Sequence, residues 1–265
     1  MNTGSRKAFM KRSLEALSVL LLFAGVILSR LYLFDIYKVP SYSMEPTLLA
    51  GDFILVSKAE YGPRVISFSK LLLKRELVYR WHRGSRKPRL DDLIVFNQPV
   101  NATENCNVSS TFGQVMVKRI TGLPGDSVRI YRPGTGRACA DVFPFDTALH
   151  WRADHYGPLY VPQKNDTLDL TEENLSHFEL VILAENLFRP GDARLFPVQP
   201  THHVFRMDYY FVTGDNFYMS SDSRHWGFVP ETHIIGKVTR ILFSRDKSSA
   251  WKSRIRWERI LKKVN

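Results

Sequence analysis

The chain has 265 residues, and its 44% hydrophobic and 12% aromatic content excludes a disordered protein. The formal net charge of +11 at pH 7 suits a partner that is either nucleic acid or an anionic membrane surface. The two cysteines, Cys106 and Cys139, lack the CxxC spacing of a zinc or redox motif. They either form a disulfide or remain two free thiols, and the sequence leaves both alternatives open.

The first predicted element is a membrane anchor from Leu14 to Phe34. Its only charges, Glu15 and Arg30, lie near its ends, and it just meets the ~20 apolar residues that a helix needs to cross a bilayer. Lysines and arginines within residues 6–12 place the N-terminus in the cytoplasm and the rest of the chain on the far side. A cleaved secretory signal is the alternative, but the bulky sequence RLYLFDIYKVP follows instead of a small-residue cleavage site. We therefore expect an uncleaved single-pass anchor.

Beyond the anchor the sequence predicts a mainly antiparallel β fold. Short β-branched and aromatic runs bounded by Gly, Pro and Asp occur as DFILVSK, DLIVFNQP, GQVMVKRITGLPGDSVRIY and YYFVTGD. Gly122 to Asp126 forms a turn between two of these runs. Residues 167–186 are expected to hold one helix, with Thr171 as its N-cap and acids in the first turn.

The stretch KVPSYSMEPTLLAGDFILVSK, directly after the anchor, contains a candidate nucleophile. Ser41 and Ser43 lie between Pro40 and Pro46, whose rings stiffen the backbone and hold a hydroxyl in place. A serine hydroxyl needs a base to accept its proton. The eight histidines of the chain lie in no known triad signature, so a lysine is the other candidate base.

Lys118, in QVMVKRITGLPGD, is a lysine in strand-like apolar surroundings. Strand alternation places it on one face with Met116 and Ile120. A lysine there is unfavourable unless it is neutral or paired, and a neutral lysine is able to accept a proton. The alternative is an edge-strand lysine that limits aggregation, and this segment alone favours that alternative.

Taken together, three segments resemble the motif boxes of type I signal peptidases. These membrane-bound Ser/Lys proteases release exported proteins from their leader peptides. The segments PSYSMEPTLLAGDFILV, VKRITGLPGD and GDNFYMSSDSRHWGFVP occur in the family's order after an N-terminal anchor. The resemblance extends from Tyr37 to about Leu242, and three boxes in order are far more specific than any one alone.

The resemblance implies a role for each matching residue. Ser43 matches the nucleophile and Lys118 the general base, while the Ser41 hydroxyl and the Ser43 backbone N–H match the oxyanion hole. Ser220 matches the serine that orients the lysine. The positions that hold the loop in place are Asp215, Asp222 and Arg224. The positions expected to line shallow pockets for small substrate residues are Tyr37, Val39, Met44, Leu48, Met116 and Val117.

The chain departs from the family pattern at three places. Phe217, Tyr218 and Met219 stand where the family usually has polar or charged residues, which puts the pinning of that loop in doubt. Asp91 stands where a glycine is expected. The segment from Asn97 to Gln114, which contains Cys106, is expanded.

The resemblance implies a membrane-anchored serine endopeptidase that cleaves signal peptides through an acyl-enzyme. A lysine base is typical of the bacterial or organellar branch, so we expect a protein of the bacterial cytoplasmic membrane. Its expected partners are signal-peptide-bearing precursors and phospholipid, without nucleic acid, cofactor or metal, and it is expected to be a monomer. Two alternatives remain: a specialised relative that matures a few conjugation or pilus substrates, and a non-enzymatic, membrane-tethered basic binding module.

The expected domain organisation follows from these assignments. Residues 1–13 are cytoplasmic and 14–34 form the anchor. Residues 35–126 and 206–245 form a catalytic β core, and 127–205 form an inserted β-rich region. Residues 246–265 form a basic C-terminal tail with interleaved tryptophans. The basic stretch from Lys237 to Lys263 is expected to be either an amphipathic helix on anionic lipid or a solvated basic tail.

Overall fold

The computed structural model describes residues 3–66, 79–81, 84–99, 114–131, 151–187, 202–246 and 255–264. This part of the chain is mainly antiparallel β-sheet with one long N-terminal helix, which confirms the predicted fold class. Cys106, Cys139 and most of the expanded segment 97–114 lie outside the described residues. The two alternatives for the cysteines therefore stay open.

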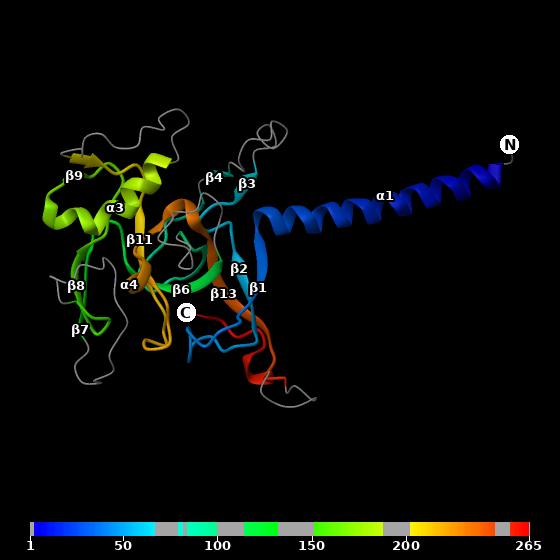
Figure 1. Ribbon diagram of the computed structural model, residues 1–265. Helices are drawn as coiled ribbons and strands as arrows, with labels where there is room; N and C mark the ends of the chain where they lie inside the picture. Colours follow the sequence, from blue (N-terminus) through cyan, green and yellow to red (C-terminus); the bar gives the residue numbers. More distant parts are fainter. Residues whose placement is uncertain are drawn as a thin grey trace.

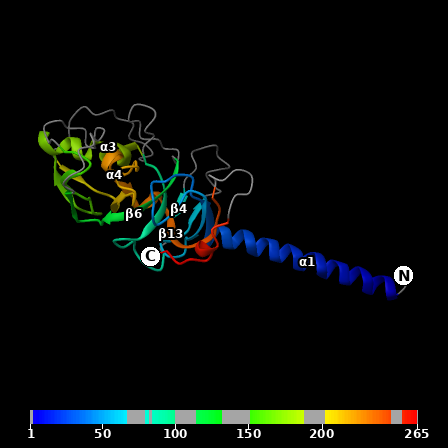
Figure 2. The same cartoon turned by 90° about the horizontal axis from the view of Figure 1, so that it is seen from below.

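The N-terminal helix α1, Thr3–Tyr32, extends away from the β-sheet body in both views (Figures 1 and 2). Its stretch from Met10 to Tyr32 is long and apolar enough to cross a membrane. This span begins before the predicted start at Leu14. It also ends before the predicted last residue, because Phe34 is the first residue of strand β1.

The junction between α1 and the sheet is held by polar contacts around one carboxylate. Asp35 accepts hydrogen bonds from Arg30 Nε at 3.0 Å and from Lys58 Nζ at 3.0 Å. Lys58 Nζ also donates to the Arg30 carbonyl, at 2.9 Å, near the end of the helix. Burial disfavours ionisation of Asp35, but the contacts with Lys58, the Ile36 N–H and Arg30 together outweigh it and lower the pKa of the carboxyl group. These contacts fix the end of the helix against the first strand.

A seven-stranded sheet forms the centre of the molecule. Its strand order is β1-β2-β13-β5-β6-β11-β12, and each neighbouring pair is antiparallel. The strands are β1 Phe34–Lys38, β2 Asp52–Ser57, β5 Leu93–Asn97, β6 Val115–Gly122, β11 Tyr209–Thr213, β12 Val229–Pro230 and β13 Ile234–Ser244. All four predicted β runs contribute strands, so segments from both ends of the chain meet in one sheet.

The remaining elements lie outside this sheet. Three two-stranded sheets pair β3 with β4, β7 with β8, and β9 with β10. The bounds are β3 Arg64–Ile66, β4 Tyr79–Trp81, β7 Ser127–Tyr131, β8 His155–Tyr160, β9 Thr167–Asp169, β10 His202–Val204, α3 Glu172–Leu187, α4 Ser223–Trp226, and the 3₁₀ turns η2 Glu231–His233 and η3 Trp257–Arg259. Elements β7, β8, β9 and α3 lie on the side of the sheet away from α1 (Figure 1). The division into a catalytic core and an inserted region stays a prediction.

The helix α3 begins where the sequence predicts. Thr171 Oγ1 accepts a hydrogen bond from the Asn174 backbone N–H, and Asn174 Oδ1 accepts one from the Thr171 N–H. This reciprocal pair satisfies N–H groups that a helix start leaves free. Phe178 and Ile182 of α3 then pack against Phe211 of β11, in a core of their own beside the large sheet.

The C-terminal segment 255–264 folds back onto the large sheet. Arg259 donates to both carboxylate oxygens of Asp52, at 3.2 and 2.6 Å, and to the Thr47 carbonyl at 2.9 Å. Val264 is buried in the core beneath the sheet. Within these described residues, the only helical element is the turn η3, and the Arg259 side chain is buried. Both interpretations of this segment, as an amphipathic helix and as a solvated tail, are therefore wrong for residues 255–264.

Candidate active site

The nucleophile candidate lies on a compact turn that follows β1. Two residues of this turn, Met44 and Leu48, are almost completely buried in the core and are joined by a hydrogen bond from Leu48 N to the Met44 carbonyl. Ser43 lies just before this buried pair and is itself half-buried. The Ser41 and Ser43 hydroxyl oxygens are 3.3 Å apart. The turn therefore fixes the backbone of Ser43 while its hydroxyl stays accessible.

Lys118 lies on β6, an interior strand of the seven-stranded sheet. Only 1% of the residue is exposed, and its Nζ atom lies 2.8 Å from Ser43 Oγ and 2.9 Å from Ser220 Oγ. Because Lys118 is almost fully buried and contacts two serines, the interpretation of it as an edge-strand lysine that limits aggregation is wrong. The structure brings the predicted base into contact with the predicted nucleophile and with the predicted orienting serine.

The surroundings of Lys118 favour its neutral form. Burial lowers the pKa of Lys118 from 10.5 to about 8. The negative charges of Asp222 and Asp215 act in the opposite direction, and the positive charge of Arg224 adds to the lowering. A neutral amine in contact with a serine hydroxyl is able to accept its proton.

The loop that carries Ser220 is held by a buried ion pair. Arg224 and Asp222 are both fully buried, and the guanidinium donates from Nε and Nη2 to the two carboxylate oxygens at 2.8 Å each. Asp222 also caps the short helix α4 and accepts a hydrogen bond from Gly214 N at 2.9 Å. Burial opposes ionisation of Asp222, but the contacts with Arg224, His225 and the Gly214 N–H together outweigh it and hold the pKa of the carboxyl group well below its ordinary value.

Gly214 and Asp215 join this loop to the nucleophile turn and to β6. A Cβ atom on Gly214 would lie 2.1 Å from Ser220 Oγ and 2.5 Å from the Ser43 carbonyl oxygen, so the position requires glycine. Asp215 accepts hydrogen bonds from Arg119 Nε and Nη2 at 2.7 and 2.8 Å. The three motif segments thus converge within hydrogen-bonding distance of one another.

The departure at Phe217 has a physical explanation. Its ring lies against the Arg224 guanidinium, with 3.9 Å between the guanidinium carbon and the ring centroid, and Arg224 Nη2 donates to the Phe217 carbonyl at 2.7 Å. The Phe217 ring therefore packs against the Arg224 guanidinium, and the partner of that guanidinium, Asp222, holds the loop in place. Tyr218 and Met219 are exposed, at 39% and 65%. The loop is pinned despite the departure.

The departure at Asp91 is explained by its backbone. Asp91 has φ +66°, in the left-handed region that favours glycine and that aspartate tolerates better than most residues. Its carbonyl accepts a hydrogen bond from Arg119 Nη1 at 2.9 Å. Asp91 therefore has a backbone conformation that glycine adopts without strain.

The predicted pocket residues fall into two groups. Tyr37, Val39, Met44, Leu48 and Val117 belong to one apolar cluster, in which Tyr37 and Val117 are partly exposed and the other three are buried. Met116 packs in a different cluster, on the other face of the sheet, because neighbouring residues of β6 point to opposite faces. The structure therefore brings together five of the six residues and separates Met116 from them, and their role in substrate binding stays a prediction.

The sequence reasoning missed three residues of the site. Arg119 pairs with Asp215, Gly214 leaves room for Ser220, and Arg259 braces the Thr47 carbonyl. Arg119 directly follows Lys118, and the Gly–Asp dipeptide at 214–215 is a turn signal, so both were within reach of the sequence. Arg259 lies 207 positions from its partner Asp52, and a pairing at such separation leaves no local signal.

Comparison with known proteins identifies the family of this chain. A family model described as signal peptidase, peptidase S26, matches residues 10–136 and 158–243. The chain is 31% identical to signal peptidase I of Haemophilus influenzae, over 89% of this chain and 71% of the relative. It is 28% identical to signal peptidase I of Buchnera aphidicola from Acyrthosiphon pisum, over 90% of this chain and 78% of the relative. Signal peptidase I of Aquifex aeolicus is 27% identical, over 87% and 84%.

Proposed function

Since the chain belongs to the signal peptidase family, peptidase S26, and is a serine protease that cleaves signal peptides, we propose that Ser43 is its nucleophile and Lys118 its general base. The observation that carries this proposal is the 2.8 Å contact between a buried lysine and a half-buried serine. Burial of that lysine lowers its pKa to about 8, so a useful fraction is neutral near physiological pH.

The geometry supports a two-step acyl transfer. Neutral Lys118 accepts the Ser43 hydroxyl proton as Oγ attacks the scissile carbonyl, and the lysine then donates that proton to the leaving amine. A water molecule attacks the resulting ester, again with Lys118 as the base, and releases the signal peptide. Ser220, in contact with Nζ, orients the amine during both steps. The Ser41 hydroxyl and the Ser43 N–H stabilise the oxyanion, where losing one donor typically costs about 3 kcal/mol.

The leader side of the substrate is proposed to bind along the first half of β6. Strand β11 pairs with β6 at Arg119, Ile120 and Gly122, which leaves the edge before Lys118 without a partner strand among the described residues. An extended peptide is able to add to such an edge through backbone hydrogen bonds. Tyr37 and Val117, over the buried Met44, offer an apolar surface there for small side chains.

The membrane orientation is proposed from the sequence flanking the anchor. The lysines and arginines within residues 6–12, in the first turns of α1, favour a cytoplasmic N-terminus, which places the sheet and Ser43 on the far side of the bacterial cytoplasmic membrane. The contacts of Asp35 with Arg30 and Lys58 hold the end of the helix against the sheet, so Ser43 stays near the height at which an anchored precursor emerges. Protease added outside sealed inside-out vesicles should spare residues 35–265 and shorten only the N-terminus.

The decisive experiment uses the full chain in detergent micelles with an exported precursor. The Ser43→Ala and Lys118→Met variants are expected to lose at least about 10³-fold in the rate of precursor cleavage. The matched controls are Ser85→Ala and Lys87→Met, because both residues are exposed and lie away from Ser43. Precursor cleavage that persists in either dyad variant would show that the assignment of Ser43 and Lys118 is wrong.

A further inference from the structure

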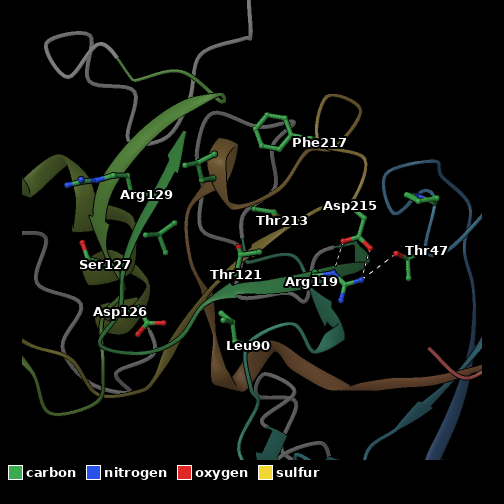
Figure 3. A pocket seen from close by; sticks show the side chains of 14 residues that line it. Thr47, Leu90, Arg119, Thr121, Asp126, Ser127, Arg129, Thr213, Asp215 and Phe217 are labelled. Atoms are coloured by element: carbon green, nitrogen blue, oxygen red, sulfur yellow. Dashed lines mark hydrogen bonds and ion pairs between the residues drawn. The ribbon is translucent and has the colours of Figure 1, made fainter. Parts of the chain in front are cut away.

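A cavity of about 740 Å³ opens beside the nucleophile turn. Along β6 it is lined by residues that follow Lys118. The apolar surface of Tyr37, Met44 and Val117 that is proposed above to bind the leader, here called the leader pocket, lies before Lys118. Thr47 of the nucleophile turn lies at one wall, and Ser127 of β7 lies at the opposite wall (Figure 3). Arg119 and Asp215 lie between these walls, where their ion pair holds the loop to β6. The volume lies in the range, on the order of 300–1,000 Å³, of sites that hold small ligands.

The cavity and the leader pocket share one face of β6, and that face changes character at the catalytic residues. Val117 packs with the apolar cluster of Met44 and Leu48. Arg119 and Thr121, which lie on the same face by strand alternation, line the cavity instead. The nucleophile turn reaches both regions, since Met44 belongs to the apolar cluster and Thr47 lines the cavity.

The pairing of β11 determines where an extended substrate must leave the sheet edge. Thr213, the last residue of β11, pairs with Arg119 directly after Lys118. A peptide lying along the open edge before Lys118 is therefore blocked at Thr213 and has to turn away from the strand. Thr213 and Gly214 form part of the cavity wall at this point.

We propose that this cavity binds the first residues of the mature protein, directly after the scissile bond, as an extended and mainly polar peptide. The proposal rests on the function proposed above, because it requires the scissile bond to lie at Ser43. A precursor is apolar before its cleavage site and begins a soluble protein after it. The change from apolar to polar along β6 matches that order.

The test compares two synthetic substrates with the same leader residues. One carries a small fluorogenic leaving group directly after the cleavage site, and the other continues with six polar mature residues. The Ser127→Trp variant fills the cavity from an exposed position that is not part of the catalytic machinery. We expect kcat/KM for the extended substrate to fall at least ten-fold and that for the minimal substrate to change less than two-fold. The control, Ser85→Trp, places the same side chain on an exposed serine outside the cavity.

A second pair of variants keeps the proposal falsifiable if Ser127→Trp disturbs the fold. Leu90 lines the cavity and is 51% exposed, so Leu90→Lys and Leu90→Glu introduce opposite charges at one position. The ratio of kcat/KM for acidic against basic mature residues should differ at least three-fold between these variants. An equal loss on both substrates, or no change in either experiment, would overturn the proposal. If the unaltered enzyme does not cleave the minimal substrate, that result would instead refute the proposed function.

Discussion

The Nζ atom of Lys118 lies 2.8 Å from the Oγ atom of Ser43, although the two residues are 75 positions apart in the chain. The contact buries an amine that is ordinarily charged, because only 1% of the Lys118 residue is exposed. Burial of this kind is unfavourable for folding, and the benefit of the contact lies in the reaction. Five predictions follow from this arrangement and from the contacts around it.

Replacing Lys118 with methionine should abolish precursor cleavage and leave the protein as stable as before, or more stable. Methionine has a similar length and needs no desolvation of a charge, so we expect a gain in the free energy of unfolding of up to about 3 kcal/mol at pH 7. Urea unfolding measures it, with Lys262→Met, at an exposed lysine, as the control. A large loss of stability would mean that the amine is a structural group.

Activity should depend on pH through the neutral fraction of Lys118. Because burial lowers the pKa of this lysine to about 8, the neutral form grows with pH below that value and is complete above it. We expect kcat/KM to rise about ten-fold per pH unit below pH 7 and to level off above pH 9. Stopped assays across this range test the prediction. A rate that stays constant between pH 6 and 9 is incompatible with a lysine base.

Substituting Gly214 with alanine should slow precursor cleavage strongly, although the substitution replaces no catalytic side chain. The new methyl carbon would lie 2.1 Å from Ser220 Oγ and 2.5 Å from the Ser43 carbonyl, so one or both must move. A displacement of about 1 Å in a positioned group costs on the order of 10²-fold in rate. The loss should appear in kcat, while binding of a leader peptide stays within a few-fold. Full activity of this variant would show that the loop moves freely.

The Asp91→Gly variant should be more stable than the natural chain. Asp91 has φ +66°, and a left-handed residue with a side chain costs roughly 1–2 kcal/mol. The greater freedom of glycine in the unfolded chain offsets part of this, so the gain should be up to about 1 kcal/mol. Thermal unfolding measures the gain. Asp169→Gly, in strand β9, is the control and should lose stability, and a loss at both positions would refute the argument.

Arg259→Met should destabilise the protein and slow the reaction together. Arg259 is the buried partner of Asp52, and removing one member of a buried pair costs about 3–5 kcal/mol. The same guanidinium holds the Thr47 carbonyl, so the nucleophile turn loses a brace and kcat should fall. Chemical unfolding and steady-state kinetics test the two effects. Arg240→Met is the control, because Arg240 is exposed and its guanidinium donates to the Leu261 carbonyl, at 3.0 Å, instead of to a buried carboxylate.

The fold class and the strands around the site were predictable because their signals are local. Alternation and turn residues predict β2, β5, β6 and β11, and a cap and first-turn acids predict α3. The position of Lys118 within the sheet was not predictable, since local alternation is the same for an edge strand and an interior strand. The order of strands depends on pairing between distant segments, which leaves no local signal in the sequence.

The C-terminal fold-back was predicted incorrectly for a similar reason. The alternation of Lys and Arg with Trp and Ile in residues 237–263 is typical of a lipid-bound helix. The partner that changes this outcome is Asp52, which the sequence places in an unrelated strand. The buried carboxylate of Asp52 pairs with Arg259, which is one of several arginines in residues 237–263. Composition alone does not identify which of these arginines forms the pair.

The brace between Arg259 and the Thr47 carbonyl links two parts of the chain that are 212 positions apart. Because the guanidinium donates to a carbonyl of the nucleophile turn, the position of Ser43 depends on how the segment 255–264 is seated against the sheet. The catalytic geometry is thus coupled to a segment that lies outside all three motif boxes.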